Sequence, residues 1–295
     1  MTLTLFTPTY NRGHLLSRLY DSIATQKQIQ DLEWLIVDDG STDDTKQIVD
    51  NFIKESKVNI NYIWQENQGK MQAHNTALDH AKGTWFLCID SDDWLNSDAL
   101  DVLLKNMDVA SANEKLAGIL TMKKLLNSQK EKPNYLPTPD GTIINLSGLT
   151  KLGFQGEVNI FFKTEILKKF PFPKFDGEKY VPENIVYDLI DQKYKYITFN
   201  EFTQTAEYQE DGYTIRAKTL NILNPFGVAA YQKQKSRIVK NPIEKCKRLA
   251  SYVGYSLLAK DKKIIRNSGN MLLCLIAFPV GLAYSKKLKQ RRNAL

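Results

Sequence analysis

Cysteine is scarce in this chain of 295 residues, and the scarcity excludes several classes of protein. The three cysteines, Cys88, Cys246 and Cys274, form neither a disulfide framework nor a zinc ligand set, so we expect a reducing compartment. The first residues, MTLTLFTPTYNR, lack the basic start and long apolar run of a secretory signal peptide, and we expect a strand there instead. The chain also contains no internal repeat and no low-complexity tract.

Acidic residues are scarce in the last part of the chain. From Arg237 onward there are 14 lysines and arginines against two acids, a net charge of +12, whereas residues 1–236 carry 26 basic and 31 acidic residues, a net charge of −5. A basic tail on an acidic body predicts attraction to a polyanionic surface such as the inner face of a membrane. Few aromatic residues lie between the cations of the tail, so we expect no nucleic-acid partner.

The first half of the chain alternates between short apolar runs and segments with helical spacing. Strands are expected at residues 2–6, 33–37, 59–64 and 85–89, and helices at about 14–26 and 70–82. Another helix is expected after an N-cap at Ser41 or Thr42, with Ile48, Val49, Phe52 and Ile53 as its apolar stripe. This alternation predicts parallel strands joined by right-handed crossovers. The expected fold class is therefore α/β, with a doubly wound, mostly parallel sheet covered by helices on both faces.

Unusual polar clusters follow each of these four strands. They are 7-TPTYNR-12, 38-DDGS-41, 65-QENQGK-70 and 90-DSDD-93. The carboxyl ends of parallel strands meet at one edge of the sheet, and ligands bind beyond that edge in open α/β folds. The four clusters therefore predict a ligand site there.

The acidic cluster at 90–93 needs a compensating positive charge, which a metal ion, a lysine or water can supply. Carboxylate oxygens suit Mg²⁺ or Mn²⁺. In an extended segment Asp90 and Asp92 face the same ligand across Ser91, while Asp93 points elsewhere or supports the turn. The alternative is an N-terminal cap for a helix beginning near Ser97.

The other clusters offer groups that suit a nucleotide. Tyr10 can stack on a base or pack in the core. Asp39 can accept a hydrogen bond from a base imide N–H, and Asp38 can serve as a turn carboxylate. Arg12 and Lys70 can meet phosphate oxygens or act as ordinary surface charges.

The motifs TPTYNR, VDDGSTDDT, NQGKMQAHNTALDHAKG and CIDSDD, in this order and spacing, resemble the family 2 glycosyltransferases with the GT-A fold over roughly residues 1–110. The resemblance implies a nucleotide-sugar donor, usually linked to UDP, and an inverting transfer by one direct displacement. It also implies that Tyr10 stacks on the base, Asp39 binds the base or ribose, Asp90 lies near the ribose and Asp92 holds Mg²⁺ or Mn²⁺, with Asp90 as a second metal-site residue. The expected donor-binding residues are Thr7, Tyr10, Arg12, Asp39, Lys70, Asp90 and Ser91.

The middle of the chain resembles bacterial enzymes that build capsule, exopolysaccharide or teichoic-acid-type glycans, through EVNIFFKTEILKKFPFPKFDGEKYVPEN and EYQEDGYT. An inverting transfer needs a base for the acceptor hydroxyl. Glu183 is the candidate, Glu178 and Asp211 are alternatives, and Glu183 can equally be a helix cap or a solvated loop acid. The family usually has a Glu-Asp pair where this chain has Glu183-Asn184. The Gln-x-x-Arg-Trp motif of processive members does not occur, so we expect transfer of a single sugar to a glycan or lipid-linked acceptor. The alternative function is that of a catalytically inactive, nucleotide-sugar-binding partner subunit of another glycosyltransferase.

We expect a glycosyltransferase domain over 1–220, with a nucleotide-binding half at 1–110 and an acceptor half at 111–220, followed by a helical, basic region at 221–295. That region contains 271-MLLCLIAFPVGLAY-284, which lacks charge. As a helix it would extend ~21 Å, short of a ~30 Å hydrocarbon core, and Pro279 and Gly281 are expected to interrupt it. Its basic flanks predict a position in the membrane interface, with the protein peripheral on the cytoplasmic face of the cell membrane. The alternative is packing on the catalytic domain or on a second copy of the chain.

Overall fold

The structure, a computed structural model, describes residues 2–126, 135–207, 209 and 212–295. The chain forms two compact units, each built from two segments. The first unit is Met1–Pro171 with Leu189–Gln209, and the second is Phe172–Asp188 with Glu210–Leu295. The two units do not meet at residue 220. The expected division between a glycosyltransferase domain at 1–220 and a basic region at 221–295 concerns function and stays a prediction.

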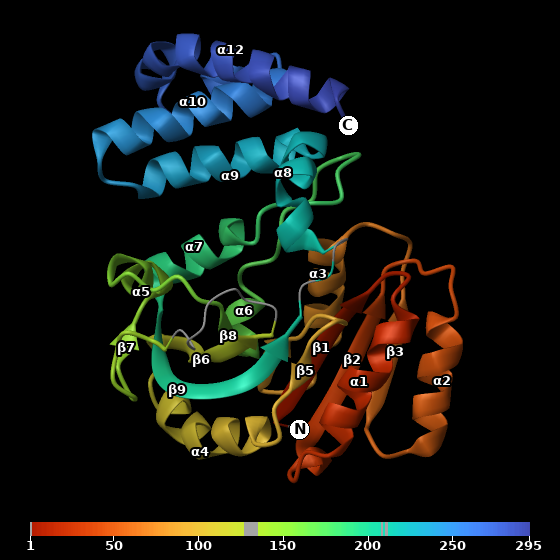
Figure 1. Cartoon of the computed structure of the whole chain (residues 1–295). Helices are drawn as coiled ribbons and strands as arrows, with labels where there is room; N and C mark the ends of the chain where they lie inside the picture. The colour runs from red at the N-terminus through yellow and green to blue at the C-terminus, as the bar shows by residue number, and fades with distance from the viewer. Residues whose placement is uncertain (1, 127–134, 208, 210–211) are drawn as a thin grey trace. The chain divides into compact units, whose positions relative to one another are not determined.

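The first unit begins with the alternation that the sequence predicts (Figure 1). Its elements are β1 (Leu3–Thr9), α1 (Gly13–Ala24), a 3₁₀ turn (Ile29–Asp31), β2 (Leu32–Asp38), α2 (Thr45–Glu55), β3 (Ile60–Trp64), α3 (Lys70–His80), β4 (Trp85–Cys88), β5 (Trp94–Leu95), α4 (Ala99–Ser111), β6 (Leu116–Leu125), β7 (Ile143–Ile144), α5 (Leu146–Lys151), β8 (Val158–Lys163), α6 (Thr164–Leu167) and β9 (Lys195–Ala206). Helix α7 (Asn184–Lys193) contains the boundary between the two units.

One sheet contains all of the described strands. Its order is β3-β2-β1-β4-β8-β6-β9-β5, and β7 pairs with β9. The strands β1 to β4 pair in parallel, which confirms the expected α/β fold with a mostly parallel sheet. Strand β8 enters antiparallel to both β4 and β6, an arrangement that the sequence interpretation did not include.

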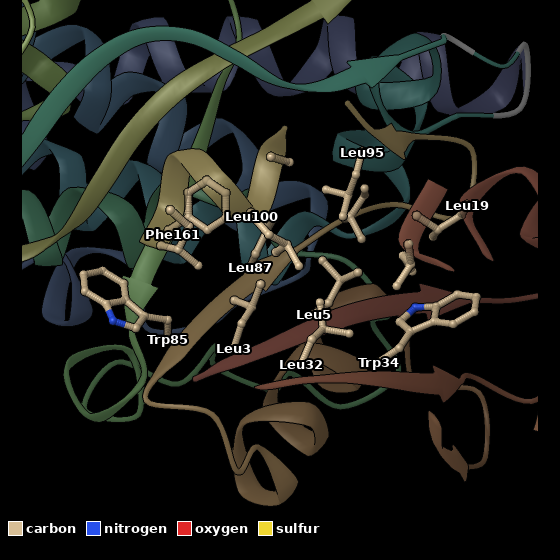
Figure 2. Packing of buried hydrophobic residues seen from close by; sticks show 14 of the residues in the cluster. Leu3, Leu5, Leu19, Leu32, Trp34, Trp85, Leu87, Leu95, Leu100 and Phe161 are labelled. Atoms are coloured by element: carbon tan, nitrogen blue, oxygen red, sulfur yellow. The ribbon is translucent and has the colours of Figure 1, made fainter. Parts of the chain in front are cut away.

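The core of the first unit follows from the alternation of side chains along each strand. Successive residues point to opposite faces of a strand. Leu3 and Leu5 of β1 pack in a buried cluster with Leu19 of α1 and Trp34 of β2 (Figure 2). Phe6 contacts the ring of His74 on α3 instead. Both faces of β1 are thus covered, which holds its carboxyl end at a fixed place.

The second unit is helical. It contains α8 (Tyr213–Leu223), α9 (Pro225–Ile238), α10 (Pro242–Leu258), α11 (Ile264–Asn267) and α12 (Met271–Asn293). Asn241 caps α10 by accepting hydrogen bonds from two backbone amides, and Pro242 occupies the first turn, where no N–H is needed.

Helices α10 and α12 pack closely because small residues face each other. A Cβ added to Gly281 would lie 2.5 Å from Cβ of Val253, and one added to Gly254 would lie 2.6 Å from the Tyr284 ring. The expected interruption at Pro279 and Gly281 is wrong, because α12 is continuous over 23 residues. Gly281 is used for this close approach, and Pro279 is accommodated inside the helix.

Candidate active site

The four polar clusters meet at one edge of the sheet. In the strand register Thr9 lies beside Asp38, and Asp38 lies beside Trp64, so β1, β2 and β3 end together. Strand β4 pairs with β1 from the other side, with Cys88 beside Phe6. The loops after all four strands therefore leave the sheet at the same edge, as the sequence predicts.

The loops after β1 and β2 are joined by hydrogen bonds. The backbone N–H of Asn11 donates to Ser41 Oγ at 2.8 Å, and Asn11 Oδ1 accepts from the Thr42 N–H at 2.8 Å. Asn11 adopts a positive φ of 51°, which an Asn side chain tolerates better than most. The side chain of Tyr10 is 49% exposed, so core packing is excluded and its ring remains accessible for stacking.

Asp38 and Asp39 are buried and have different partners. Asp38 accepts from the Ser41 N–H at 2.7 Å and from the Tyr62 hydroxyl at 2.6 Å. Asp39 accepts from Gln65 Nε2 at 2.7 Å and from the backbone amides of Gln68 and Gly69 at 2.9 and 2.7 Å. Asp39 thus holds the loop that leads into α3.

Gly40 and Gly69 make this loop arrangement sterically possible. Gly40 has a φ of +87°, and a Cβ there would lie 3.0 Å from the Asn67 nitrogen. Gly69 has a φ of 93° and immediately precedes Lys70, the first residue of α3. Both conformations favour glycine, which has no Cβ.

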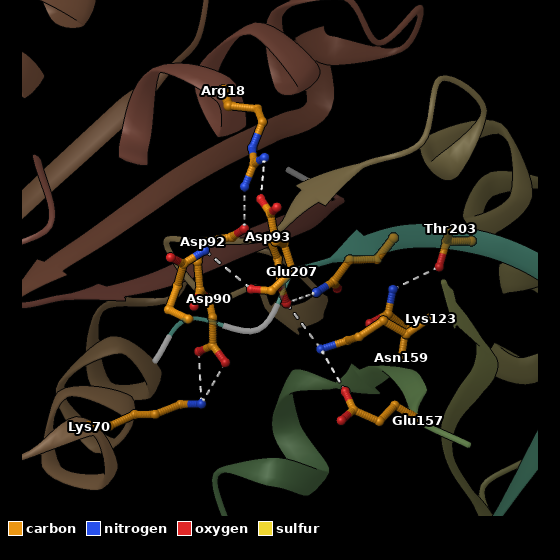
Figure 3. A network of polar contacts seen from close by, with 12 residues as sticks. Arg18, Lys70, Asp90, Asp92, Asp93, Lys123, Glu157, Asn159, Thr203 and Glu207 are labelled. Atoms are coloured by element: carbon orange, nitrogen blue, oxygen red, sulfur yellow. Dashed lines mark hydrogen bonds and ion pairs between the residues drawn. The ribbon is translucent and has the colours of Figure 1, made fainter. Parts of the chain in front are cut away.

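Each of the three aspartates after β4 has its own cation. Figure 3 shows the pairs of Asp90 with Lys70 and of Asp93 with Lys123. Lys70 Nζ lies 2.8 Å from an oxygen of Asp90, and Arg12 Nη1 lies 3.0 Å from Asp92 Oδ2. Lys123 Nζ, from β6, lies 3.1 Å from Asp93 Oδ2. Asp93 also accepts a hydrogen bond from Gln204 Nε2 on β9, and Lys123 lies 3.7 Å from Glu157.

The segment is a turn and not an extended strand, which corrects the expected geometry. The Asp93 N–H donates to the Asp90 carbonyl oxygen at 3.0 Å, and Ser91 is buried. Within this turn the charge of the Asp90 carboxylate helps to raise the pKa of Asp92, after burial as the larger cause. The cap alternative also fails, since the residue preceding α4 is Asp98 and its side chain makes no capping hydrogen bond.

Burial and neighbouring charges shift the pKa values of the three carboxyls. Burial alone would raise the pKa of Asp90, but Lys70 and then Lys123 lower it overall. Burial and the charge of Asp90 raise the pKa of Asp92. Burial raises the pKa of Asp93 to about 6, although Lys123 opposes the rise. The fold therefore concentrates negative charge where water is limited.

The residues at this edge fit a divalent cation held partly by a ligand. Among the described residues, no group of three or more His, Cys, Asp or Glu side chains is placed to hold a metal ion. Mg²⁺ is usually bound by one or two carboxylates together with substrate phosphates, and Asp90 and Asp92 supply two such carboxylates in one turn. His74 is not part of this set. It is buried with its ring centroid 5.6 Å from that of Phe6 and 5.3 Å from that of Phe86, and burial and then Lys70 lower its pKa to about 3.

The side chain of Thr7 has its hydrogen-bond partner inside the sheet. Its side chain is fully buried, and Thr7 Oγ1 accepts a hydrogen bond from Trp34 Nε1 at 2.9 Å. Thr7 belongs to the middle of β1, two residues before the strand ends at Thr9. We therefore leave its side chain out of the proposed donor site.

Sequence reasoning missed Lys123 and Arg18. Arg18 Nη2 donates to the carbonyl oxygen of Asp92 at 2.8 Å, its Nη1 donates to Glu207 at 2.8 Å, and its guanidinium lies 3.8 Å from the centre of the Trp94 ring. The only sequence signal for Arg18 was its position on the helix that follows β1. Lys123 carried a better signal, because it is a charge that follows the buried run of a central strand.

The candidate bases of the acceptor half lie in the second unit or outside the described residues. Glu183 directly precedes α7, and its carbonyl oxygen accepts from the Val186 N–H at 3.0 Å. Glu178 accepts from the backbone amides of Phe226 and Gly227 at the start of α9, both at 2.7 Å, so it has the contacts of a helix cap. Asp211 lies outside the described residues.

Comparison with curated proteins shows relatives that transfer sugars. The chain is 28% identical over 281 residues to the GalNAc(5)-diNAcBac-PP-undecaprenol beta-1,3-glucosyltransferase of Campylobacter jejuni, covering 92% of this chain and 86% of that protein. It is 27% identical over 235 residues to the poly(ribitol-phosphate) beta-N-acetylglucosaminyltransferase TarS of Staphylococcus aureus. That match covers 76% of this chain but only 41% of TarS.

Solved structures share the fold. The crystal structure of S. aureus TarS 1–349 in complex with UDP-GlcNAc matches with a TM-score of 0.62 and 18% identity, covering 100% of this chain and 92% of that chain. A mannosyltransferase from Pyrobaculum calidifontis in complex with GDP-Man and Mn²⁺ matches with a TM-score of 0.56 and 21% identity, covering 96% and 73% of the two chains. These matches confirm the expected GT-A fold.

The family model described as "Glycosyl transferase family 2" matches residues 4–170, more than half of the chain. That range contains the ends of β1 to β4 and the three aspartates with their cations. The protein is therefore a glycosyltransferase that belongs to family 2.

Proposed function

We propose that the protein moves one sugar from a UDP-sugar to a hydroxyl of a lipid-linked bacterial glycan, with inversion and without processive extension. The observation that carries the proposal is the strand-end group of Arg12, Lys70, Asp90 and Asp92, in which two carboxylates of one turn pair with cations from the ends of other strand connections. The names of the relatives support it, because one acts on an undecaprenol-linked acceptor and another transfers N-acetylglucosamine to a polymer.

In this proposal the donor-binding residues of the first unit contact different parts of the UDP-sugar. Tyr10 stacks on the uracil, and Asp39 accepts a hydrogen bond from the base or the ribose, as the family resemblance implies. Arg12 and Lys70 face the departing diphosphate, where fixed positive charge stabilises the charge that develops. Mg²⁺ or Mn²⁺, bound by Asp92 and Asp90 with phosphate oxygens, would add Lewis-acid stabilisation of the same leaving group.

The acceptor hydroxyl must lose its proton during a direct displacement, and a carboxylate is the expected base. Glu183 remains our candidate. Glu178 is the weaker one, because both of its oxygens accept backbone amides. We place the reaction at the cytoplasmic face of the membrane, which agrees with a lipid-linked acceptor and with a chain that has only three cysteines.

The decisive experiment compares Asp92→Asn with Asp98→Asn. Asp98 is an exposed aspartate six residues later that makes no capping hydrogen bond through its side chain, so it is a matched control. With a panel of UDP-sugars, Mn²⁺ and a lipid-linked acceptor, we expect Asp92→Asn to lower transfer at least about a hundredfold, in the range seen when one transition-state contact is lost. Asp98→Asn should keep the activity of the unmodified protein.

Calorimetry separates donor binding from catalysis. UDP should bind the unmodified protein more tightly with Mn²⁺ than with a chelator, and Asp92→Asn should lose that difference. Glu183→Gln should keep it while losing transfer. Equal UDP affinity with and without the chelator would reject the metal-dependent site, and full transfer by Glu183→Gln would move the base to another carboxylate.

A further inference from the structure

Helix α12 exposes a continuous apolar face on the second unit. Its side chains there are 43–72% exposed, and they are Met271, Leu272, Leu275, Ile276, Val280 and Leu282. The opposite face is buried against the rest of the unit through Cys274, Ala277, Gly281, Ser285 and Leu288. Exposed apolar patches of this kind mark interaction sites more often than isolated surface residues do.

Positive charge flanks this face at both ends. Before the helix lie Lys260, Lys262, Lys263 and Arg266, and after its apolar part lie Lys286, Lys287, Lys289, Arg291 and Arg292, all of them exposed. The only acid between residues 260 and 292 is Asp261. An apolar strip bounded by cations complements a surface that is apolar at depth and anionic above, which describes an anionic phospholipid bilayer. A protein partner would need an apolar surface bounded on both sides by acidic residues to match the apolar strip and its basic flanks.

The packing of α12 favours a position in the plane of the membrane. Its 23 residues are long and apolar enough to cross a bilayer, by length and composition only. However, Gly281 and Tyr284 lie tightly against Val253 and Gly254 of α10. An upright α12 would lose these contacts or draw the charged residues of α10, such as Arg248, into hydrocarbon, which is costly. Lying flat, α12 keeps its contacts with α10 and places both basic flanks at the headgroups.

We propose that the exposed face of α12 is a docking surface for an anionic phospholipid bilayer, with its apolar side chains in the acyl boundary and its flanking lysines and arginines on the headgroups. This proposal does not depend on which sugar is transferred. Vesicle binding needs neither donor nor acceptor, so it can fail or succeed separately from the proposed transfer reaction.

The first test floats the full chain with vesicles of phosphatidylcholine containing phosphatidylglycerol, and with vesicles of phosphatidylcholine alone. We expect binding to the anionic vesicles, at least about tenfold weaker binding to the neutral ones, and a marked loss at high salt. The apolar variant combines Leu272→Gln, Ile276→Gln and Val280→Gln and should abolish flotation. Its matched control combines three exposed apolar residues of the first unit, Ile53→Gln, Val109→Gln and Ile143→Gln.

The second test changes charge alone. The variant Lys286→Gln, Lys287→Gln and Lys289→Gln should weaken binding to anionic vesicles at least about tenfold. The control Lys27→Gln, Lys46→Gln and Lys54→Gln removes the same net charge from exposed sites of the first unit and should bind like the unmodified protein. Circular dichroism and thermal unfolding of each variant should match the unmodified protein, because all of these side chains are exposed.

Three outcomes would overturn the proposal. One is failure of the unmodified chain to float with either vesicle. Another is an equal loss of vesicle binding in the apolar variant and in its matched control. The last is a stable dimer of the unmodified chain that the apolar variant alone dissociates, since the face would then belong to a second copy.

Discussion

The three ion pairs at the strand edge differ in how much water reaches them. The side chains of Lys123 and Asp93 are 16% and 6% exposed, whereas the Asp90 side chain, paired with Lys70, is 37% exposed. Removing one partner of a buried pair leaves a charge without compensation, and this costs more than losing a surface pair. Lys123 should therefore matter for stability, although it is not among the proposed donor-binding residues.

We predict that Lys123→Met lowers the free energy of unfolding by about 3 kcal/mol, because the Asp93 carboxylate is left buried beside Asp90 and Asp92. Chemical denaturation monitored by circular dichroism measures this loss. The double variant Lys123→Met with Asp93→Asn should recover part of it, since neither charge then remains unpaired.

Lys124→Met is the matched control for that experiment. Lys124 is the exposed neighbour of Lys123 on β6, and its replacement should change stability by less than about 0.5 kcal/mol. If Lys123→Met unfolds at the same denaturant concentration as the unmodified protein, the pair with Asp93 has no stabilising role.

At the residue scale, the sequence indicated which groups meet but not how they pair. Motif spacing placed Arg12, Asp39, Lys70 and the three aspartates at one edge. It left open whether a metal, a lysine or water offsets the acidic charge, and the fold supplies one cation for each aspartate. Lys123 escaped prediction because its partner is 30 residues away in sequence and the pairing depends on sheet order.

At the scale of elements, local patterns succeeded where neighbours in sequence are neighbours in space. Strands β1 to β4 and helices α1 to α3 follow from periodicity, and the parallel pairing of these strands follows from their alternation with helices. The antiparallel position of β8 between β4 and β6 has no local sequence signal, because strand pairing depends on residues that are far apart in the chain. Pro279 misled the prediction of α12, because packing can retain a helix that local preference would break.

The contact between α10 and α12 provides a test at this scale. Gly281→Val places a branched side chain against Val253 and the Ala250 carbonyl oxygen, which a Cβ at residue 281 would already approach to 2.8 Å. We predict a loss of about 1–3 kcal/mol in the stability of the helical unit, as for other overpacked sites. Thermal unfolding followed by circular dichroism at 222 nm should show it.

Ala283→Val controls for helix propensity, because residue 283 lies on the same helix and is exposed. It should cost less than about 1 kcal/mol. Equal losses in the two variants would show that the β-branched side chain itself, and not the contact with α10, causes the effect.

At the scale of the whole molecule, the proposed donor-site residues and the proposed membrane-docking face belong to different compact units. Arg12, Asp39, Lys70 and Asp92 all lie in the first unit, and α12 lies in the second. A ligand that binds only the native first unit stabilises it by about 2.7 kcal/mol at one hundred times its dissociation constant. Slower amide hydrogen exchange should therefore be seen in the segments of the first unit that contact the ligand.

We predict that UDP with Mn²⁺ slows amide hydrogen exchange in residues 38–42, 65–70 and 89–93, and leaves residues 242–293 unchanged. Mass spectrometry of the exchanged full chain resolves these segments. The protein with Mn²⁺ alone is the control, since Asp90 and Asp92 are expected to need phosphate oxygens to complete the site. Equal protection across both units would contradict a donor site confined to the first.

The carboxylate of Asp39 has a consequence for genetics. It is expected to recognise the nucleoside, yet it also fixes the amides of Gln68 and Gly69, directly before Lys70. One altered codon at position 39 would therefore disturb uridine recognition and the lysine beside Asp90 at once. A screen that scores lost activity would overestimate the importance of the base contact, and only second-site revertants near Gln65 or Lys70 would reveal the two separate contributions.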